Sequence, residues 1–243
     1  MRAVLATYGR ELRAYFFSPL AYVVLFFFLA INGLIFYGLI GQLTQPGAPA
    51  VPPMSFFFTG TGLMLLILGV VLTMRLVSEE LKSGSIEVLM TAPVTEGQVV
   101  AGKYLAALTF FAFLWLPTVA YPAVIAYHES VDWGPVAAGY LGILLVGALF
   151  LAVGTFVSAT TRSQLVAAMV TAVLLFLLFL IAWIGELINT DLSRQVSGYL
   201  DLGAHMDEFS RGIVDTRRLV YYLSAILFFL FLASRALEDK KWR

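Results

Sequence analysis

The sequence predicts an all-α polytopic membrane protein with six transmembrane helices. The chain has 243 residues, of which 60% are hydrophobic and only 12% are charged, against about 25% charged residues in a typical soluble domain. Its mean hydropathy is +0.91. Six apolar runs approach or exceed the roughly 20 residues that a helix needs to cross a bilayer. They contain no Asp, Glu, Lys or Arg and cover residues 20–40, 56–74, 104–127, 135–158, 165–185 and 219–234.

Residues 1–18 predict an amphipathic helix that lies along the membrane surface. Leu5, Tyr8, Leu12 and Tyr15 follow helical spacing and form one apolar stripe, with the arginines of this segment on other faces. The segment lacks the short apolar core and small-residue cleavage site of a removable signal peptide. A frayed terminus is the alternative that the pattern leaves open.

The positive charges are distributed unequally between the two sides of the predicted bundle. With the N-terminus in the cytoplasm, eleven Lys and Arg residues lie on the cytoplasmic side and four on the other. The eleven are Arg2, Arg10, Arg13, Arg75, Lys82, Lys103, Arg162, Arg235, Lys240, Lys241 and Arg243, and the four are Arg194, Arg211, Arg217 and Arg218. The positive-inside rule therefore predicts a multi-pass protein of the cytoplasmic (inner) membrane with both termini in the cytoplasm.

Two of the predicted spans carry residues that affect helix geometry or packing. Pro117 removes a backbone donor from the third span and favours a kink there. The fourth span contains four glycines that let neighbouring helices approach closely, namely Gly139, Gly142, Gly147 and Gly154. These glycines fit either a tightly packed bundle or the seam of a dimer, and the sequence does not choose between the two.

The connection 186–218 predicts short amphipathic helices on the outer side of the membrane. An apolar stripe at helical spacing consists of Tyr199, Leu202, Met206, Phe209 and Ile213, and the polar residues around His205 and Glu208 lie opposite to it. These helices either dip into the membrane and cap a pathway as an outer gate, or form a solvated surface pair.

Residues 78–103 form a compact cytoplasmic segment between the second and third spans. Ser78 is a plausible helix N-cap with two acidic residues behind it, Gly84 interrupts that helix, and Ser85 can begin another that ends at Pro93. Thr95 and the glutamine three residues later have capping-box spacing, so the next helix begins in the cytoplasm. Apolar residues among the charges predict a helical knob that contacts either lipid or a soluble partner.

At these residues the chain resembles the type-2 ABC export permeases. The matching pattern reads Glu80, Gly84, Ser85, Ile86, Glu87, Thr91, Pro93, Val94, Gly102 and Lys103. The stretch GAHMDEFSRGIVDTRRLVYYLS is similar to the branch that contains the gliding-motility and copper-enzyme-maturation permeases. The resemblance extends over the whole chain, through the N-terminal helix, six spans and the outer helical segment.

The resemblance implies that the cytoplasmic knob is a coupling helix that docks into a separate ABC ATPase subunit. The expected coupling residues are Glu79, Glu80, Lys82, Gly84, Ser85, Ile86, Glu87, Val88, Leu89 and Pro93. Two ATPase copies that bind ATP and Mg²⁺ are expected, with a second permease chain, identical or related, and a possible periplasmic or auxiliary membrane subunit. The chain itself is expected to bind the lipid bilayer and no cofactor, metal or nucleic acid.

The residues also weigh against other classes of function. The predicted spans carry no ionisable group for a coupling ion, and the chain has no G-x-x-x-x-G-K-[ST] phosphate loop. The two histidines, His128 and His205, form no H-E-x-x-H motif, and the absence of cysteine excludes thiol chemistry. We therefore expect no catalytic site. A passive channel or structural scaffold without an ATPase stays open, and the uncharged spans favour a hydrophobic or amphipathic substrate or the transmission of force.

Overall fold

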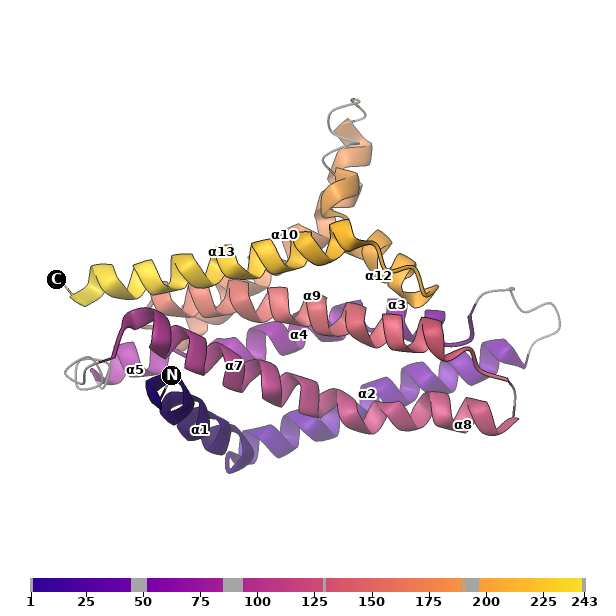
Figure 1. Ribbon diagram of the computed structural model, residues 1–243, viewed down its shortest axis with the longest axis horizontal. Helices are drawn as coiled ribbons and strands as arrows, with labels where there is room; N and C mark the ends of the chain where they lie inside the picture. The colour runs from indigo at the N-terminus through magenta and orange to yellow at the C-terminus, as the bar shows by residue number, and fades with distance from the viewer. Residues whose placement is uncertain are drawn as a thin grey trace.

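The structure is a computed structural model that describes residues 2–44, 52–84, 94–128, 130–188, 190 and 197–241. Within these ranges the chain forms helices and turns and no strand. Six segments are long and apolar enough to cross a membrane, which confirms the predicted all-α polytopic fold. Most of them run along one elongated bundle, and both chain termini lie at the same end (Figure 1).

Four of the six segments are single helices. These are α2 (Pro19–Leu43), α9 (Trp133–Thr160), α10 (Gln164–Ile188) and α13 (Thr216–Lys241). Helix α13 continues beyond the predicted end of its span at residue 234. Its last turns remain helical with the support of an i,i+3 ion pair between Arg235 and Glu238, whose charged atoms are 2.6 Å apart.

The second predicted span contains a break. It comprises α3 (Ser55–Gly60) and α4 (Gly62–Thr73), which meet at Thr61. The Thr61 hydroxyl donates a hydrogen bond of 2.8 Å to the Phe58 carbonyl. This side-chain bond, together with glycines on both sides, competes with continuous backbone bonding and explains the interruption.

The third predicted span is interrupted where the sequence predicts a kink. Helix α7 (Glu96–Trp115) tightens into the 3₁₀ turn η1 (Leu116–Val119) before α8 (Ala120–His128). Pro117 has no backbone N–H and cannot continue the α-helical bonding pattern. The Thr118 hydroxyl donates to the Trp115 carbonyl at 2.7 Å, so the interruption leaves this carbonyl satisfied.

Helix α9 lies at the centre of the bundle, and its glycines receive side chains from its neighbours. A Cβ atom placed on any of the four predicted packing glycines would lie within 3 Å of a side chain from another helix. The pairs are Gly139 with Phe58, Gly142 with Phe209, Gly147 with Phe111 and Gly154 with Thr73. These partners come from α3, α12, α7 and α4. The sequence left open whether these glycines pack a tight bundle or line the seam of a dimer. Their contacts lie within one chain, which supports the tightly packed bundle.

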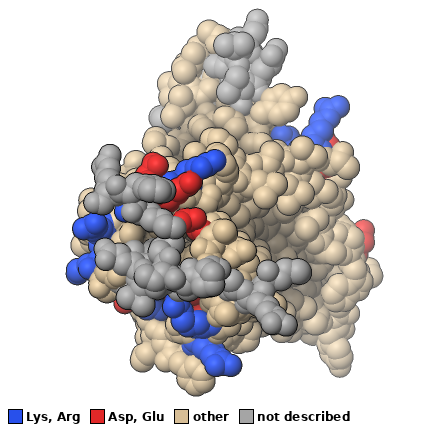
Figure 2. Space-filling view, turned by 60° about the vertical axis from the view of Figure 1, so that its left-hand side comes forward, with Lys and Arg blue, Asp and Glu red and all other residues tan. Residues whose placement is uncertain are grey.

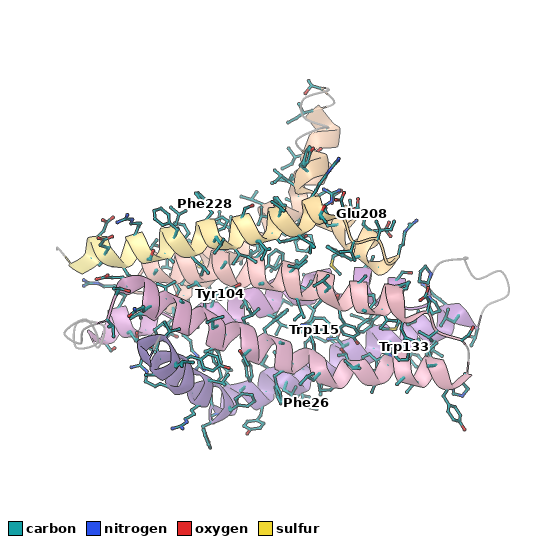
Figure 3. All side chains as sticks on the ribbon, viewed as in Figure 1. Phe26, Tyr104, Trp115, Trp133, Glu208 and Phe228 are labelled. Atoms are coloured by element: carbon teal, nitrogen blue, oxygen red, sulfur yellow. The ribbon has the colours of Figure 1, made fainter. Side chains whose placement is uncertain are left out.

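Three of the long helices keep broad apolar faces exposed. Helices α2, α10 and α13 bury only a small share of their residues, and side chains such as Phe26 and Phe228 point away from the bundle (Figure 3). By contrast, Tyr104 and Trp115 of α7 point into the bundle and are buried. The exposed faces suit contact with lipid tails.

Helix α1 (Arg2–Phe16) packs against α7 through its aromatic residues. Tyr15 stacks on Phe110 with ring centroids 5.1 Å apart, and Phe16 meets Phe113 edge-on at 4.9 Å. Leu5, at the other end of the predicted apolar stripe, is exposed. The stripe therefore divides its contacts between the bundle and the surroundings, and the predicted position along the membrane surface stays a prediction.

Candidate functional site

The short helix α5 (Ser78–Ser83) begins the segment that the sequence marks for coupling. Two glutamates occupy its first turn, where the helix dipole favours negative charge. Gly84 ends it with φ of +71°, a left-handed conformation that glycine adopts without a steric penalty. The end of the bundle that carries α1 and α5, called here the α5 end, gathers many of the charged side chains on the face shown in Figure 2.

The sequence predicted Ser78 as the N-cap of α5, and this prediction is wrong. The N-terminus of α5 is capped by a side chain from another helix. Ser78 is the first helical residue, and its hydroxyl donates to the Met74 carbonyl. The Ser158 hydroxyl of α9 accepts hydrogen bonds from the amides of Val77 (3.0 Å) and Ser78 (3.1 Å). One side chain thus satisfies two of the amides that a helix start leaves without partners. It also ties α5 to the central helix.

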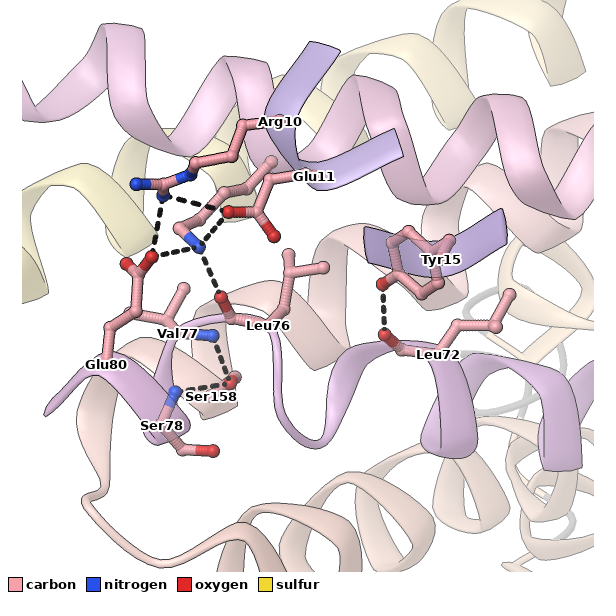
Figure 4. A network of polar contacts seen from close by, with 10 residues as sticks. Arg10, Glu11, Tyr15, Leu72, Leu76, Val77, Ser78, Glu80 and Ser158 are labelled. Carbon is pink, nitrogen blue, oxygen red and sulfur yellow. Dashed lines mark hydrogen bonds and ion pairs between the residues drawn. The ribbon is translucent and has the colours of Figure 1, made fainter. Parts of the chain in front are cut away.

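A buried lysine connects α5 to α1 and α7. The side chain of Lys103 is only 1% exposed. Its Nζ lies 2.9 Å from Glu11 Oε1, 3.0 Å from Glu80 Oε1 and 2.8 Å from the Leu76 carbonyl oxygen. The ammonium group donates hydrogen bonds to Glu11 and to the Leu76 carbonyl, and Glu80 adds an ion pair, so the buried charge is paired with two carboxylates (Figure 4).

A second cation completes this group of charges. One guanidinium nitrogen of Arg10 lies 2.9 Å from Glu11 and 2.7 Å from Glu80. Arg10 is half exposed, whereas both carboxylates are largely covered. Two cations and two anions therefore form a neutral cluster, which we call the four-charge network: Arg10, Glu11, Glu80 and Lys103. It joins three elements that are far apart in the sequence.

Tyr15 adds a further attachment between α1 and the end of α4. Its hydroxyl donates a 2.6 Å hydrogen bond to the Leu72 carbonyl, as Figure 4 shows. Burial raises the pKa of the Tyr15 hydroxyl, so this group remains a protonated donor. The Arg75 guanidinium lies over the ring of Tyr15, 5.8 Å from its centroid, at a distance suited to a cation–π contact.

The predicted coupling residues fall into three groups. Glu79 and Lys82 are exposed on α5, and Glu80 points inward to the four-charge network. Gly84 forms the end of α5. The others lie outside the described residues, namely Ser85, Ile86, Glu87, Val88, Leu89 and Pro93. Beyond them, Thr95 and Gln98 form the capping box that their spacing predicts at the start of α7.

Sequence reasoning missed the partners that hold α5 in place. Arg10 and Glu11 looked like ordinary surface charges of an amphipathic helix, and Ser158 looked like a serine without a role. The only available signal was the pair of opposite charges at positions 10 and 11, which lie on a helix that otherwise presents aromatic residues to α7. A local pattern does not identify contacts over such sequence separations.

At the opposite end of the bundle, α12 (Leu202–Ser210) buries part of the predicted outer stripe. Leu202, Met206 and Phe209 are buried, whereas Tyr199 and Ile213 are exposed. The outer-gate prediction for these five residues stays a prediction.

The polar side of α12 differs from the expected solvated face. His205 is fully buried, with Nδ1 2.9 Å from the Tyr222 hydroxyl. Burial, and then the nearby Arg218 charge, lower the pKa of His205 to about 4. Arg218 forms two hydrogen bonds of 3.0 Å to Glu208 (labelled in Figure 3), and these bonds lower the pKa of the Glu208 carboxyl.

Comparison with known proteins gives one family match. The family model described as ABC-2 family transporter protein matches residues 11–198, a range that includes the first five spans and the whole α5 region. A comparison with curated proteins finds no match. The family match does not identify the narrower branch that the sequence resembles.

Proposed function

The chain belongs to the ABC-2 transporter family and is a membrane-spanning permease subunit of an ABC transporter, and from this premise we propose that a separate ATPase subunit drives it through α5. The observation that carries this proposal is the attachment of α5 to three other elements. The four-charge network joins it to α1 and α7, and Ser158 joins it to α9. A push on α5 would therefore move the bundle and not only a loop.

The face of α5 that is free for a partner supports the same proposal. Glu79 and Lys82 are exposed, and Gly84 turns the chain directly into the predicted apolar coupling residues. Apolar residues flanked by charges are typical of a docking surface with an apolar centre and a polar rim. In this proposal Ile86 inserts into a groove of the ATPase.

The proposed assembly contains two permease chains and two ATPase subunits in the cytoplasmic membrane. ATP and Mg²⁺ bind to the ATPase subunits, and this chain holds no catalytic site of its own. ATP binding draws the ATPases together, moves the α5 regions of both permeases and opens the outer side. The cargo is a hydrophobic or amphipathic substrate, or the movement acts as force on a periplasmic or auxiliary subunit.

The test is to co-express the chain with candidate ABC ATPase subunits from the same genome and to measure co-purification and permease-stimulated ATP hydrolysis in nanodiscs. Ile86→Asp should reduce ATPase association about tenfold or more, because burial of an isoleucine contributes about 1.5–3 kcal/mol. Lys82→Glu should weaken association less, because it lies at the rim of the proposed surface. Membrane insertion of both variants should be unchanged.

Ile213→Asp provides the matched control. Ile213 is an exposed isoleucine at the opposite end of the bundle, so its replacement should leave ATPase association intact. Equal behaviour of the Ile86 and Ile213 variants would refute docking at α5. Failure of any ATPase to co-purify, combined with passive solute flux through the reconstituted chain, would favour the channel alternative.

A further inference from the structure

The buried stripe of α13 ends in a lysine. The fully buried residues of this helix follow helical spacing and form one stripe toward the bundle, namely Tyr222, Ile226, Ala233 and Leu237. Lys240 lies three residues after Leu237, so it continues the stripe, and it is partly buried. Because side chains on a helix are tilted toward its N-terminus, the Lys240 side chain leaves α13 in the direction of the bundle.

Helices α9 and α13 run parallel and side by side (Figure 1). Near their starts, a Cβ atom on Gly212 would lie 3.2 Å from Pro135. Further along, the rings of Phe156 and Phe229 lie 6.1 Å apart. Since both helices rise by about 1.5 Å per residue, this register places the end of α9 beside the last turns of α13. Arg162, an exposed residue in the connection between α9 and α10, therefore lies near the end of the buried stripe.

Arg162 and Lys240 are two like charges without a carboxylate between them. Partial burial and the positive charge of Arg162 both act against the Lys240 ammonium. None of the ion pairs among the described residues includes either cation. The acidic residue Glu238 is instead paired with Arg235, at 2.6 Å. An anion that contacts both cations would replace this repulsion with attraction.

The apolar surface of the bundle begins at the same level. The first turns of α10 expose Leu165 and Met169, which are 69% and 61% exposed. One candidate membrane span begins at Gln164, directly after the connection, and another ends at Lys240. Arg162 and Lys240 therefore lie at the level of lipid headgroups, and the exposed α10 side chains lie at the level of the acyl chains. A lipid bound here keeps its tails in the bilayer and needs no closed pocket.

We infer that Arg162 and Lys240 hold the phosphate of one anionic phospholipid at the α5 end of the bundle. The planar guanidinium of Arg162 presents a fork of N–H donors that matches a phosphate, and Lys240 supplies a second positive charge. The acyl chains lie against the exposed face of α10 at Leu165 and Met169. A headgroup with a net negative charge, such as phosphatidylglycerol, is preferred. In phosphatidylcholine the lipid's own ammonium group already neutralises the phosphate.

The inference does not rest on ATPase coupling, and the experiment uses the permease chain alone. Purified, delipidated protein is mixed with dioleoyl phosphatidylglycerol or phosphatidylcholine, and bound lipid is counted by native mass spectrometry. Because each basic residue near an anionic membrane surface contributes about fivefold in affinity, phosphatidylglycerol should bind about tenfold or more tightly than phosphatidylcholine. Arg162→Gln and Lys240→Gln should each weaken phosphatidylglycerol binding about fivefold. Lys240→Arg, which keeps the charge, should bind this lipid as the unmodified chain does.

Lys82→Gln is the matched control, because Lys82 is an exposed lysine on α5 at the same end of the bundle. Its replacement changes the net charge equally and should leave phosphatidylglycerol binding unchanged. Equal binding of the two lipids, unchanged binding in the folded Arg162 and Lys240 variants, or an equal loss in the Lys82 variant would overturn the inference. So would displacement of phosphatidylglycerol by millimolar inorganic phosphate, because the site would then take a soluble phosphate and not a lipid.

Discussion

The replacement Lys103→Met tests the four-charge network directly. Methionine keeps the length of the side chain and removes only its charge and donors. The substitution leaves two largely covered carboxylates and the Leu76 carbonyl without the ammonium group that now contacts all three at 2.8–3.0 Å. Removing one partner of a buried ion pair costs about 3–5 kcal/mol. Because Arg10 still contacts both carboxylates, we expect the lower end, about 3 kcal/mol.

This loss corresponds to roughly a hundredfold change in the unfolding equilibrium. It can be measured by titrating the protein with a denaturing detergent in mixed micelles and following the loss of helix. Lys82→Met is the control, because Lys82 is an exposed lysine on α5, where a substitution should change the free energy of unfolding by no more than about 0.5 kcal/mol.

A double variant separates the charge effect from simple loss of packing. In Lys103→Met with Glu80→Gln, one uncompensated carboxylate is gone, so the double variant should be at least about 1 kcal/mol more stable than the sum of the single changes predicts. The reasoning fails if the Lys103 variant matches the Lys82 control. It also fails if the two single effects simply add, since the network would then carry no coupling between α5 and α7.

Two further predictions concern the centre and the far end of the bundle. Gly147→Ala should destabilise the protein by about 1–3 kcal/mol in the same titration, because the added Cβ would lie 2.2 Å from an aromatic ring of α7. Gly9→Ala, whose Cβ would meet nothing within 4 Å, should instead stabilise it by up to about 1 kcal/mol. The pKa of His205 is about 4 in the folded state against 6.5 ordinarily. The unfolded chain therefore binds a proton first, and stability should fall by up to about 3 kcal/mol as the pH drops from 6.5 to 4. His205→Gln should make the free energy of unfolding less dependent on pH between 6.5 and 4. The same pH dependence in this variant and in the unmodified chain would contradict the prediction.

The sequence predicts the fold class well because each of the relevant signals is local. Apolar length fixes which segments can span a bilayer, and the capping box at Thr95 sits within four residues of chain. The proline in the third span likewise acts on its own helix, at η1. The break at Thr61 was missed, because two glycines and a hydroxyl inside an apolar run do not interrupt the hydropathy pattern.

The site is less predictable because its contacts depend on how distant helices meet. Glu80 was expected to face a partner, yet its carboxylate turns inward because Lys103 and Arg10 converge on it. His205 was placed on the polar side of an amphipathic helix. In the structure Tyr222 of α13 covers that side. Helical spacing within the 199–213 segment identifies one apolar face of that segment and cannot show that another helix covers its polar face.

The network also limits how α5 can respond to a force from any source. If α5 moved alone, Glu80 would separate from Lys103 and leave a charge buried and unpaired, at a cost of several kcal/mol. Its first amides would also lose Ser158. Movement of α1, α5 and α7 together preserves every one of the ion pairs in the network. Because the Ser158 bonds also tie α5 to α9, the lower-energy response is a concerted displacement of α1, α5, α7 and α9, so a small movement at α5 can reach the membrane spans through α7 and α9.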